Sequence, residues 1–335
     1  MHQTTPIFIT GGAGFIGANL VHKFIRDGYT KLHVLVEKNS NLWRLQPVMN
    51  HVHIHESSLT DHVCIQNLVH TIQPTHIFHL ASYGGMPHQN DQKTIYDVNF
   101  YGTINLLNAC KAVGFACFIN TGSSSEYGIK DTPMNENTLL EPVSDYGVAK
   151  AAATQFCLKE ALFNKLPVYT VRPFSVYGNY EMPTRLIPTI LVNALRNTSI
   201  NLSSQHSVRD FIYIEDMVAL YDAIAQRPPR GMYILNGGTG TQSSIGGVIA
   251  IIEECVGKTL DVHWGTSAPR PWEPRSWQAD SAHTQAATGW SPRFTLREGL
   301  AASLVWFAQH ISSYEHKDTN DTNTNYQPKH STPNI

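Results

Sequence analysis

Two side chains in the stretch SDYGVAKAAATQFC, Tyr146 and Lys150, have the types and the spacing that proton transfer needs. They are four residues apart at the start of a predicted helix, so both project from one helix face. A tyrosine with a pKa of about 10 is a poor acid or base at neutral pH. A neighbouring ammonium group favours the phenolate, which can take a proton from an alcohol. The pair therefore predicts acid–base chemistry at an alcohol or a ketone.

A glycine-rich loop, ITGGAGFIGANL, stands between the first predicted strand and the first predicted helix. Gly11, Gly14 and Gly17 allow a tight turn, close approach of a pyrophosphate to the backbone, and close packing of the helix on the sheet. The helix N-terminus favours an anion. A strand on one side and a helix on the other is the context that this motif requires. The loop predicts a dinucleotide-binding site near the N-terminus.

The second predicted strand, LHVLVEK, ends at Glu37, at the distance from the loop where an acid binds the adenosine ribose. A carboxylate accepts a hydrogen bond from the ribose 2′-hydroxyl and repels a 2′-phosphate. We therefore expect NAD as the cofactor, with NADP less favoured. Lys38 and Arg44 are close in sequence and could soften this preference.

Elements that position these residues follow an alternating order in the first half of the chain. Strands are expected at 6–10, 32–36, 76–80, 115–121 and 167–172, and another falls on the stretch HVHIHE. Helices are expected at 15–26, 61–72, 94–113 and 144–163. This alternation indicates parallel strands joined by right-handed crossovers, which is an α/β fold with a doubly wound parallel sheet.

The rhythm loosens after residue 174, which predicts a smaller α/β domain in the C-terminal half. Further helices are expected at 183–196, 216–225, 245–256 and 296–309, and strands at 210–214, 232–236 and 260–263. We assign residues 1–177 to a cofactor domain and 178–311 to a substrate domain partly interleaved with it. Residues 312–335 are polar and poor in aliphatic side chains, so a disordered tail is expected there.

Composition narrows the class of partner. The 335-residue chain carries a formal net charge of −2, which creates no global field for nucleic acid or an acidic membrane. No apolar run is long enough for a membrane helix, and no signal peptide is visible. The five cysteines are scattered without a CxxC spacing, as reduced thiols would be. We expect a cytoplasmic protein that binds neither nucleic acid nor membrane.

With these motifs in order, the chain resembles the extended short-chain dehydrogenase/reductase family. Within it, the sequence is similar to the NAD-dependent epimerase/dehydratase group, which acts on nucleotide sugars. The resemblance runs from residue 7 to about residue 302. Further matching segments are HLAS at 79–82, VNFYGTINLLNAC at 98–110, RPFSVYG at 172–178, RDFIYIEDM at 209–217 and LNGGTG at 235–240.

The resemblance implies roles for many residues of the cofactor domain. Relatives bind the dinucleotide through the glycine loop, the ribose-binding acid, an adenine-side pair, the backbone after the fourth strand, and the catalytic pair. The adenine-side match is weakened because Ser58 stands where relatives usually have an aspartate. The implied cofactor-binding residues are Gly11, Gly14, Phe15, Ile16, Gly17, Glu37, Ser58, Leu59, Leu80, Ala81, Ser82, Asn99, Tyr146, Lys150 and Phe174.

Catalytic and substrate roles also follow from the resemblance. Relatives place a catalytic serine or threonine four residues before the tyrosine of NTGSSSEYG, and that position is Ser123. It joins Tyr146 and Lys150 as the expected catalytic set, whereas Tyr127 has Asp131 rather than a lysine four residues on. We interpret Tyr127 as structural or substrate-contacting. The implied substrate-binding residues are Ser124, Ser125, Ser175, Arg209 and Arg270, with Ser175 replacing the usual asparagine.

The next two serines distinguish between reactions. Related 4,6-dehydratases carry an acid at one or both of these positions, because loss of water needs a base for one carbon and an acid for another. Ser124 and Ser125 supply neither, and Glu126 comes one residue late, which on an extended segment reverses its direction. A local bulge would bring Glu126 back, so dehydration stays an alternative.

The favoured chemistry is hydride exchange at a sugar carbon, C4 by resemblance. A 4-epimerase and a 4-keto reductase both fit it. The ribose-binding acid favours the epimerase. The unusual Ser175, and the loss of a usual Gly-Asp near Trp272–Glu273, favour the reductase. An inactive NAD-sensing regulator is a further alternative, against which the intact serine, tyrosine and lysine speak.

Two other features have competing interpretations. His51, His53 and His55 alternate along one strand face and could bind zinc, but ordinary neutral histidines explain them better, so no metal is expected. The two longest helices often pair in this family's dimers through a four-helix contact. They carry Leu106, Leu107, Phe156 and Leu158, for which an intramolecular core role is equally allowed. A homodimer is therefore an expectation from resemblance alone.

Overall fold

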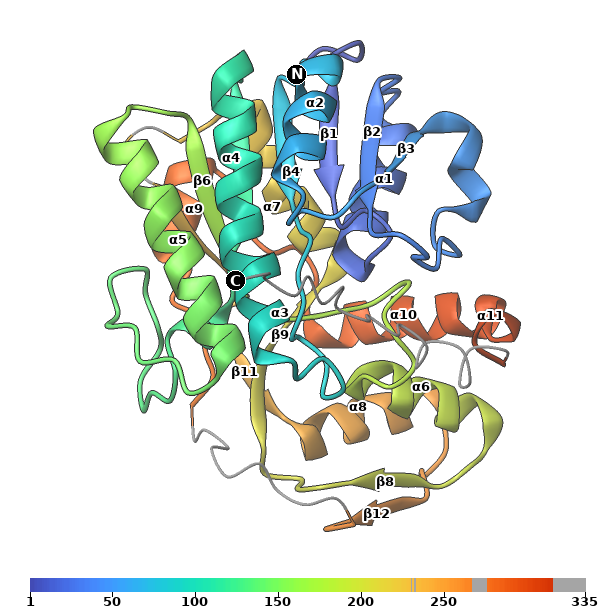
Figure 1. Cartoon of the computed structure of the whole chain (residues 1–335). Coiled ribbons are helices and arrows are strands. Elements are labelled where there is room, and N and C mark those ends of the chain that lie inside the picture. Colours follow the sequence, from blue (N-terminus) through green and yellow to red (C-terminus); the bar gives the residue numbers. More distant parts are fainter. Residues whose placement is uncertain (230, 232, 267–275, 316–335) are drawn as a thin grey trace, which may run out of the picture.

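The computed structural model describes residues 1–229, 231, 233–266 and 276–315, and a parallel sheet forms its centre (Figure 1). The strand order is β10-β6-β5-β4-β1-β2-β3, and every neighbouring pair is parallel. The predicted doubly wound α/β fold is confirmed. The strands are β1 (Ile7–Thr10), β2 (Leu32–Val36), β3 (His53–Glu56), β4 (His76–His79), β5 (Cys117–Thr121), β6 (Val168–Pro173) and β10 (Ile234–Gly237).

Helices cover both faces of this sheet. Side chains alternate along β1, where Ile7 and Ile9 join one buried cluster and Phe8 joins the other. Burial on both faces explains why these strands are continuous apolar runs. On one face α1 packs on α7, and on the other α2 packs on α4. The helices are α1 (Phe15–Arg26), α2 (His62–Ile72), α4 (Gly102–Val113), α5 (Asp145–Phe163) and α7 (Ile214–Gln226).

The long helix expected at 94–113 is wrong as a single regular helix. It is built from α3 (Gln92–Tyr96), a π-helical turn at Asp97–Tyr101, and then α4. The wider turn contains Asn99, whose side-chain amide donates to the carbonyl oxygens of Ile95 and Tyr83 at 2.7 and 2.6 Å. The helix thus fastens the loop that follows β4, and π-helical turns commonly accompany such functional loops.

The C-terminal half of the chain forms two small sheets and contributes to the large one. Because β10 and α7 belong to the main sheet and its helical layer, chain segments beyond residue 177 are shared between the two parts. The domain boundary at 177/178 stays a prediction. The additional strands are β7 (Ser175–Tyr177), β8 (Ile200–Leu202), β9 (Val208–Tyr213), β11 (Gln242–Ser244) and β12 (Val262–Trp264). The additional helices of this half are α6 (Leu186–Arg196), α8 (Ile245–Val256), α9 (Ala282–Thr288), α10 (Leu296–His310) and α11 (Ser312–Glu315). Two 3₁₀ helices lie earlier in the chain, η1 (Gln46–His51) and η3 (Ser124–Glu126).

The end of the described chain corrects the expected tail. Residues 312–315 are helical, and Tyr314 is only 1% exposed. Its hydroxyl donates to the carbonyl oxygen of Glu181 at 2.9 Å, and its ring packs edge-on against Trp43. The disordered segment expected from residue 312 is therefore wrong for its first four residues, because aromatic packing holds them. Residues 316–335 lie outside the described part of the chain.

Two further expectations concern helix surfaces. Leu106 and Leu107 are fully buried in the chain's own core, and Phe156 packs against the same cluster. An intramolecular role therefore accounts for these side chains. Within the described ranges, the helices are all too short or too polar to cross a membrane.

Candidate active site

The glycine loop lies between the adjacent strands β1 and β4, where the order of successive strands in the sheet reverses (Figure 1). Such a switch point is where doubly wound sheets bind ligands. Gly11 has a φ of +69°, and a Cβ placed on it would lie 2.5 Å from the backbone nitrogen of Ala81. The glycine loop and the backbone of Leu80 and Ala81 after β4 therefore lie in close contact, and their role as a wall of the cofactor site stays a prediction.

The N-terminus of α1 is open towards this loop. Gly14 is its N-cap and makes no side-chain capping hydrogen bond, so the first amide groups of the helix have no side-chain partner there. A Cβ on Gly17 would lie 2.3 Å from the carbonyl oxygen of Gly11. These glycines thus maintain a cradle of backbone N–H groups that side chains would fill. Its shape and polarity fit the pyrophosphate of NAD.

Glu37 follows β2 directly and is exposed at this edge of the sheet. Arg44, which could have favoured NADP, is instead directed at the backbone. Its guanidinium donates to the carbonyl oxygens of Tyr180 and Ala13 at 2.7 and 3.2 Å. The carboxylate of Glu37 therefore fits a ribose diol at the sheet edge, and Arg44 holds the glycine loop against the segment after β7.

The adenine-side and loop residues have mixed geometry. Leu59 is buried, whereas the Ser58 hydroxyl pairs with that of Thr60 at 2.9 Å. Asn99 is fully buried, and its side chain binds the backbone of Tyr83 and its own helix. Asn99 therefore shapes the loop beside the cofactor site through hydrogen bonds within the chain.

The predicted catalytic residues come together beyond the carboxyl ends of β4 and β5. The hydroxyls of Ser123 and Ser82 lie beside the phenol of Tyr146, and both lower its pKa. Ser82 was expected only as part of the cofactor wall, so its hydroxyl contact is a finding of the structure. Tyr146 projects from the first turn of α5, which begins at the N-cap Ser144. The tyrosine is thus held at a helix start, between the β4 and β5 loops.

Lys150 lies one turn further along α5 and is 2% exposed. Its Nζ atom donates to the carbonyl oxygen of Thr121 at 2.9 Å and stands 5.8 Å from the centre of the Tyr146 ring. The hydroxyl of Thr121 in turn pairs with that of Tyr221 at 2.8 Å. The end of β5 therefore orients the ammonium group beside the tyrosine.

Burial sets the protonation of this pair. It raises the pKa of Tyr146 to about 12, against the lowering effect of its serine partners and of Arg185. It lowers the pKa of Lys150 to about 8, against the raising effect of Glu126. Lys150 is therefore mostly protonated at neutral pH. Its charge, like that of an oxidised nicotinamide, favours the phenolate of Tyr146.

The serine turn is closed by Glu126. Ser123 caps η3 by accepting from the Ser125 backbone at 3.1 Å, and Glu126 accepts from the Ser123 backbone at 2.8 Å. Glu126 is fully buried, and Ser124 is 5% exposed. The carboxylate therefore points into the protein interior. Tyr127 is buried too, with its hydroxyl donating to Asn236 at 2.7 Å, so it is structural.

The predicted substrate-binding residues lie on the small sheet and beyond it. Ser175 opens β7 and is opposite Phe211 of β9. Arg209, also on β9, places its guanidinium 6.0 Å from the ring centre of Trp277. Phe174 packs against the Tyr127 cluster. Arg270 and Trp272–Glu273 lie outside the described residues.

Sequence reasoning missed Arg185, the N-cap residue of α6. Its guanidinium donates to the carbonyl oxygen of Gly85 at 3.3 Å, and its charge lowers the pKa of Tyr146. Arg185 therefore brings a positive charge from the C-terminal half of the chain towards the tyrosine. The only signal in the sequence is its place directly before the helix LIPTILVNALR.

The histidines of β2 and β3 form a stack at the far edge of the sheet. Nδ1 of His33 and Nε2 of His55 are 3.0 Å apart, and the ring of His53 stacks on that of His33 at 4.8 Å. One hydrogen bond and ring stacking account for the cluster. In the described part of the chain, groups of three or more potential metal ligands are absent.

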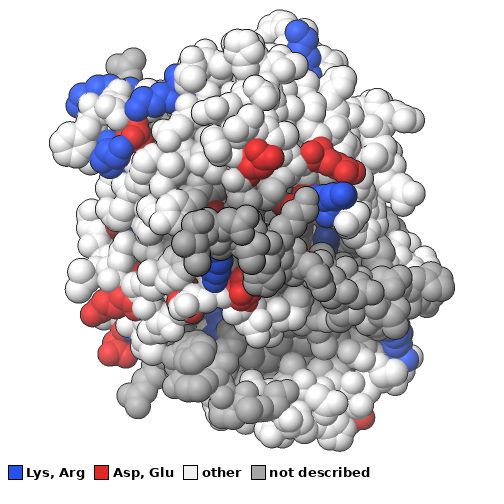
Figure 2. All heavy atoms as spheres, in the orientation of Figure 1, with Lys and Arg blue, Asp and Glu red and all other residues white. Residues whose placement is uncertain are grey.

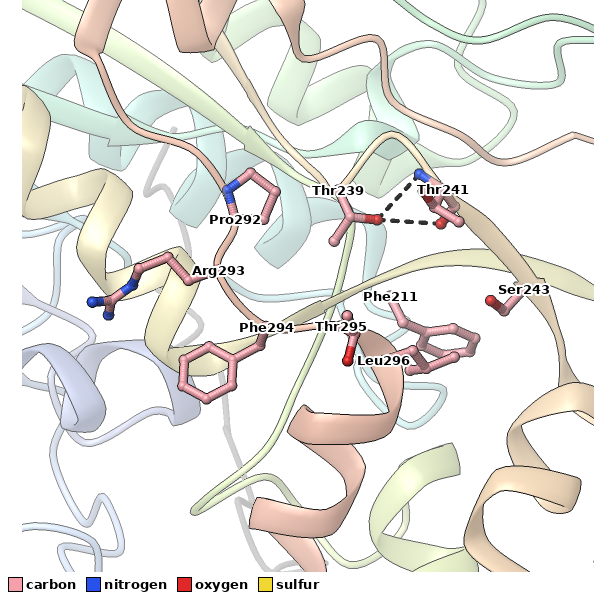
Figure 3. A pocket seen from close by; sticks show the side chains of 9 residues that line it. All are labelled: Phe211, Thr239, Thr241, Ser243, Pro292, Arg293, Phe294, Thr295 and Leu296. Atoms are coloured by element: carbon pink, nitrogen blue, oxygen red, sulfur yellow. Dashed lines mark hydrogen bonds between the residues drawn. The ribbon is translucent and has the colours of Figure 1, made fainter. Parts of the chain in front are cut away.

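A separate hollow of about 300 Å³ lies in the C-terminal part of the molecule (Figure 3). It is lined by Phe211 of β9, by residues of the segment 239–243 and by the segment 292–296, and the hydroxyl of Thr239 is turned towards the backbone of Thr241. The residues of the predicted catalytic set are not among its lining. Over the described part of the face in Figure 2, acidic and basic side chains form small separate groups without one dominant sign.

Known proteins resemble this chain over most of its length. A family model described as the NAD dependent epimerase/dehydratase family matches residues 7–236. An uncharacterized UDP-glucose epimerase of Bacillus subtilis is 27% identical, over 90% of this chain and 98% of that protein. A dTDP-glucose 4,6-dehydratase of Streptomyces griseus is 26% identical, over 93% and 97%. The solved structure of MoeE5 in complex with UDP-glucuronic acid and NAD has 28% identity and a TM-score of 0.80, covering 91% of this chain and 99% of that one.

Proposed function

This chain belongs to the NAD dependent epimerase/dehydratase family, and we propose that it is an NAD-dependent nucleotide-sugar 4-epimerase. One observation favours hydride transfer without dehydration: Ser123, Tyr146 and Lys150 meet, while Glu126 is bonded in the interior. The exposed acid Glu37 at the end of β2 favours NAD, and with it the epimerase over the reductase. The near-equal identities to an epimerase and to a dehydratase do not separate the two reactions. The side chains next to Tyr146 favour epimerisation over dehydration.

The chain's own residues supply acid–base chemistry and orientation. Bound NAD would accept a hydride from C4 of the sugar and return it to the opposite face. Tyr146, as phenolate, takes the proton of the C4 hydroxyl and later gives it back. Ser123 hydrogen-bonds the same sugar oxygen and holds it towards the phenol. Lys150 stabilises the phenolate and, in this proposal, binds the nicotinamide ribose.

Dehydration needs one further acid–base pair beside C5 and C6. The two positions after Ser123 hold Ser124 and Ser125, and a hydroxyl is a poor base for a carbon acid. Glu126, the remaining acid, is fully buried and bonded to Arg172, Thr154 and the Ser123 backbone. These contacts support hydride transfer without loss of water.

A 4-keto reductase is the second candidate, favoured by Ser175 in place of the family's asparagine. It uses the same residues with a reduced cofactor and a keto sugar. MoeE5, solved with UDP-glucuronic acid and NAD, makes UDP-sugars the first substrates to test. CDP-, dTDP- and GDP-sugars complete the panel.

The test is incubation of the purified protein with this panel while absorbance of the reduced cofactor and product identity are followed together. An isomerised sugar without net NADH consumption is the expected result. Net NADH consumption with a keto sugar would instead identify a reductase, and a 4-keto-6-deoxy product would identify a dehydratase. Tight NAD binding without any turnover would replace the enzyme with a regulator.

We also propose a homodimer through the outer faces of α4 and α5. Tyr101, the N-cap residue of α4, is 55% exposed, and Val148, Leu162 and Phe163 of α5 are 40, 44 and 79% exposed, although all are large apolar or aromatic side chains. Val148 and Leu162 are two heptads apart on α5 and therefore share a face. Sedimentation of the wild type and of Leu162→Lys tests this, because a lysine in an apolar contact should yield monomers.

A further inference from the structure

Glu126 is a charged group that the proposed reaction does not use, although it lies directly beneath the catalytic serine. It is fully buried. One carboxylate oxygen, Oε1, accepts from the Ser123 backbone nitrogen at 2.8 Å and from the Thr154 hydroxyl at 2.9 Å. The same oxygen is thus shared between the serine turn and helix α5.

Thr154 belongs to the catalytic face of α5. It follows Tyr146 and Lys150 in steps of four residues, so the three side chains project from one side of the helix. A carboxylate that binds both Thr154 and the Ser123 backbone fixes the distance between the serine turn and this face. Space for it exists because residue 122 is a glycine, whose Cβ would lie 2.4 Å from Oε1.

The second carboxylate oxygen binds Arg172 on β6. The Nε atom of Arg172 donates to Oε2 of Glu126 at 2.7 Å, and the side chains of Arg172 and Glu126 are 1% and 0% exposed. The guanidinium also donates to the Tyr127 hydroxyl at 3.0 Å and lies 4.7 Å from the centre of that ring. Glu126 is therefore held from three sides, by the serine turn, by α5 and by β6.

The charge of Glu126 also acts on the catalytic lysine. The titratable groups around Lys150 are Glu126, Tyr146, Cys157 and His79. Burial keeps Cys157 a neutral thiol by raising its pKa, and it lowers the pKa of His79 to about 3, so this ring is neutral as well. Of these groups Glu126 is the carboxylic acid, and its side chain is paired with the Arg172 guanidinium at 2.7 Å. It raises the pKa of Lys150 against the effect of burial.

We infer that Glu126 is a positioning residue, whose buried carboxylate fixes the Ser123 turn against the face of α5 that carries Tyr146, Lys150 and Thr154. The catalytic importance of this role rests on the proposed function. The effect of the Glu126 charge on Lys150 can be measured in the protein without any substrate. Glu126 does not touch the sugar. It acts through Ser123 and Lys150.

The experiment is a pH titration of Lys150 by NMR of ¹³Cε-labelled lysine, with Lys150→Met assigning the signal. In Glu126→Gln the pKa of Lys150 should fall by about one unit or more, because the nearby negative charge is lost. With an active substrate, kcat/KM should fall about 10- to 100-fold, because the serine turn loses its anchor. The alkaline limb of its pH profile should move to lower pH with the lysine.

Two further variants separate this role from a structural one. Thr154→Val removes one hydrogen bond but keeps the carboxylate, so the Lys150 pKa should stay at its wild-type value. If Glu126→Gln does not fold, because Arg172 is left buried alone, Glu126→Gln/Arg172→Gln removes both charges. Because the Arg172 guanidinium lies 2.7 Å from the carboxylate and opposes its field, the Lys150 pKa should fall less in this double variant than in Glu126→Gln.

An unchanged Lys150 pKa in a folded variant that lacks the carboxylate would overturn the inference. So would a kcat/KM and a pH profile like those of the wild type. If the wild type turned over no nucleotide sugar while the Lys150 pKa fell as expected, the proposed function would fail and the coupling of Glu126 to Lys150 would stand.

Discussion

Lys150 and Tyr146 share one face of α5, with the lysine ammonium 5.8 Å from the centre of the tyrosine ring. The ammonium is oriented by a hydrogen bond to the Thr121 carbonyl oxygen at the end of β5. A strand end and a helix start, separated by more than twenty residues, thus fix one acid–base unit. This arrangement leads to the first prediction.

Tyr146→Phe should lower kcat by about 10²- to 10⁴-fold, because the proton-transfer group is removed. The dissociation constant for NAD should stay almost unchanged, since the glycine cradle and Glu37 are intact. Steady-state kinetics and calorimetry of NAD binding check the two halves. An equal loss of turnover and of NAD binding would contradict the assigned role.

Gly17→Ala should disrupt the cofactor loop. The added Cβ would lie 2.3 Å from the Gly11 carbonyl oxygen, so α1 must move away from the loop. We expect a loss of about 1–3 kcal/mol in unfolding free energy and at least about tenfold weaker NAD binding. Gly247→Ala is the matched control, because its Cβ would make an ordinary 3.4 Å contact. Similar NAD affinity in both variants would refute the cradle.

Glu37→Ala should shift cofactor preference towards NADP. Charged hydrogen bonds of about 1.5–3 kcal/mol to the ribose would be lost, which corresponds to a ten- to hundredfold change in the ratio of the NAD and NADP affinities. Lys31→Ala, exposed at the opposite end of β2, is the control and should change the ratio little. A ratio that stays constant in Glu37→Ala would remove Glu37 from the cofactor site.

The protein should lose stability as the pH falls below about 6.5. Burial lowers the pKa of His33 and of His76 to about 4 and that of His79 to about 3, and the neighbouring histidines act in the same direction on His33. The unfolded chain therefore binds more protons than the folded one between these values and the ordinary histidine pKa, so stability decreases towards acid and is retained above it.

Urea unfolding at a series of pH values checks this dependence. We expect a decrease of a few kcal/mol between pH 6.5 and pH 4, at about 1.4 kcal/mol per pKa unit for a fully buried group. His33→Gln should reduce the slope of unfolding free energy against pH. The reduction should be smaller than for a fully buried histidine, because the His33 ring is half-exposed. His70 is exposed, so His70→Gln should leave this slope unchanged. Identical slopes in the three proteins would contradict the assignment.

Regular elements with a clear period were predictable from the sequence. The bounds of α1, β2 and α8 agree with those expected, because each is a strongly apolar run closed by turn residues. The π-helical turn at Asp97–Tyr101 was not predictable, because a helix with one wider turn has the same composition as a regular one. Three-residue strands such as β8 are too short to show alternation.

Some features of the candidate site were likewise predictable from the sequence, and others were not. Motifs near one another in sequence predicted the glycine loop and the Tyr146–Lys150 pair. The position of Glu126 depends on Arg172, a partner 46 residues away on another strand, and the sequence pattern contains no trace of that contact. Arg185 likewise comes close to Tyr146 through the folding of the C-terminal half.

The position of β10 has a consequence for synthesis of the chain on the ribosome. This strand pairs with β6, which ends at Pro173, yet β10 is complete only at Gly237. At a synthesis rate of about 5–20 residues per second, β10 is made several seconds after β6, and the backbone groups on the outer edge of β6 are unpaired until then. During this interval the nascent chain presents an open strand edge, which is prone to pairing with other chains. A fragment that stops between these two strands should therefore aggregate rather than fold.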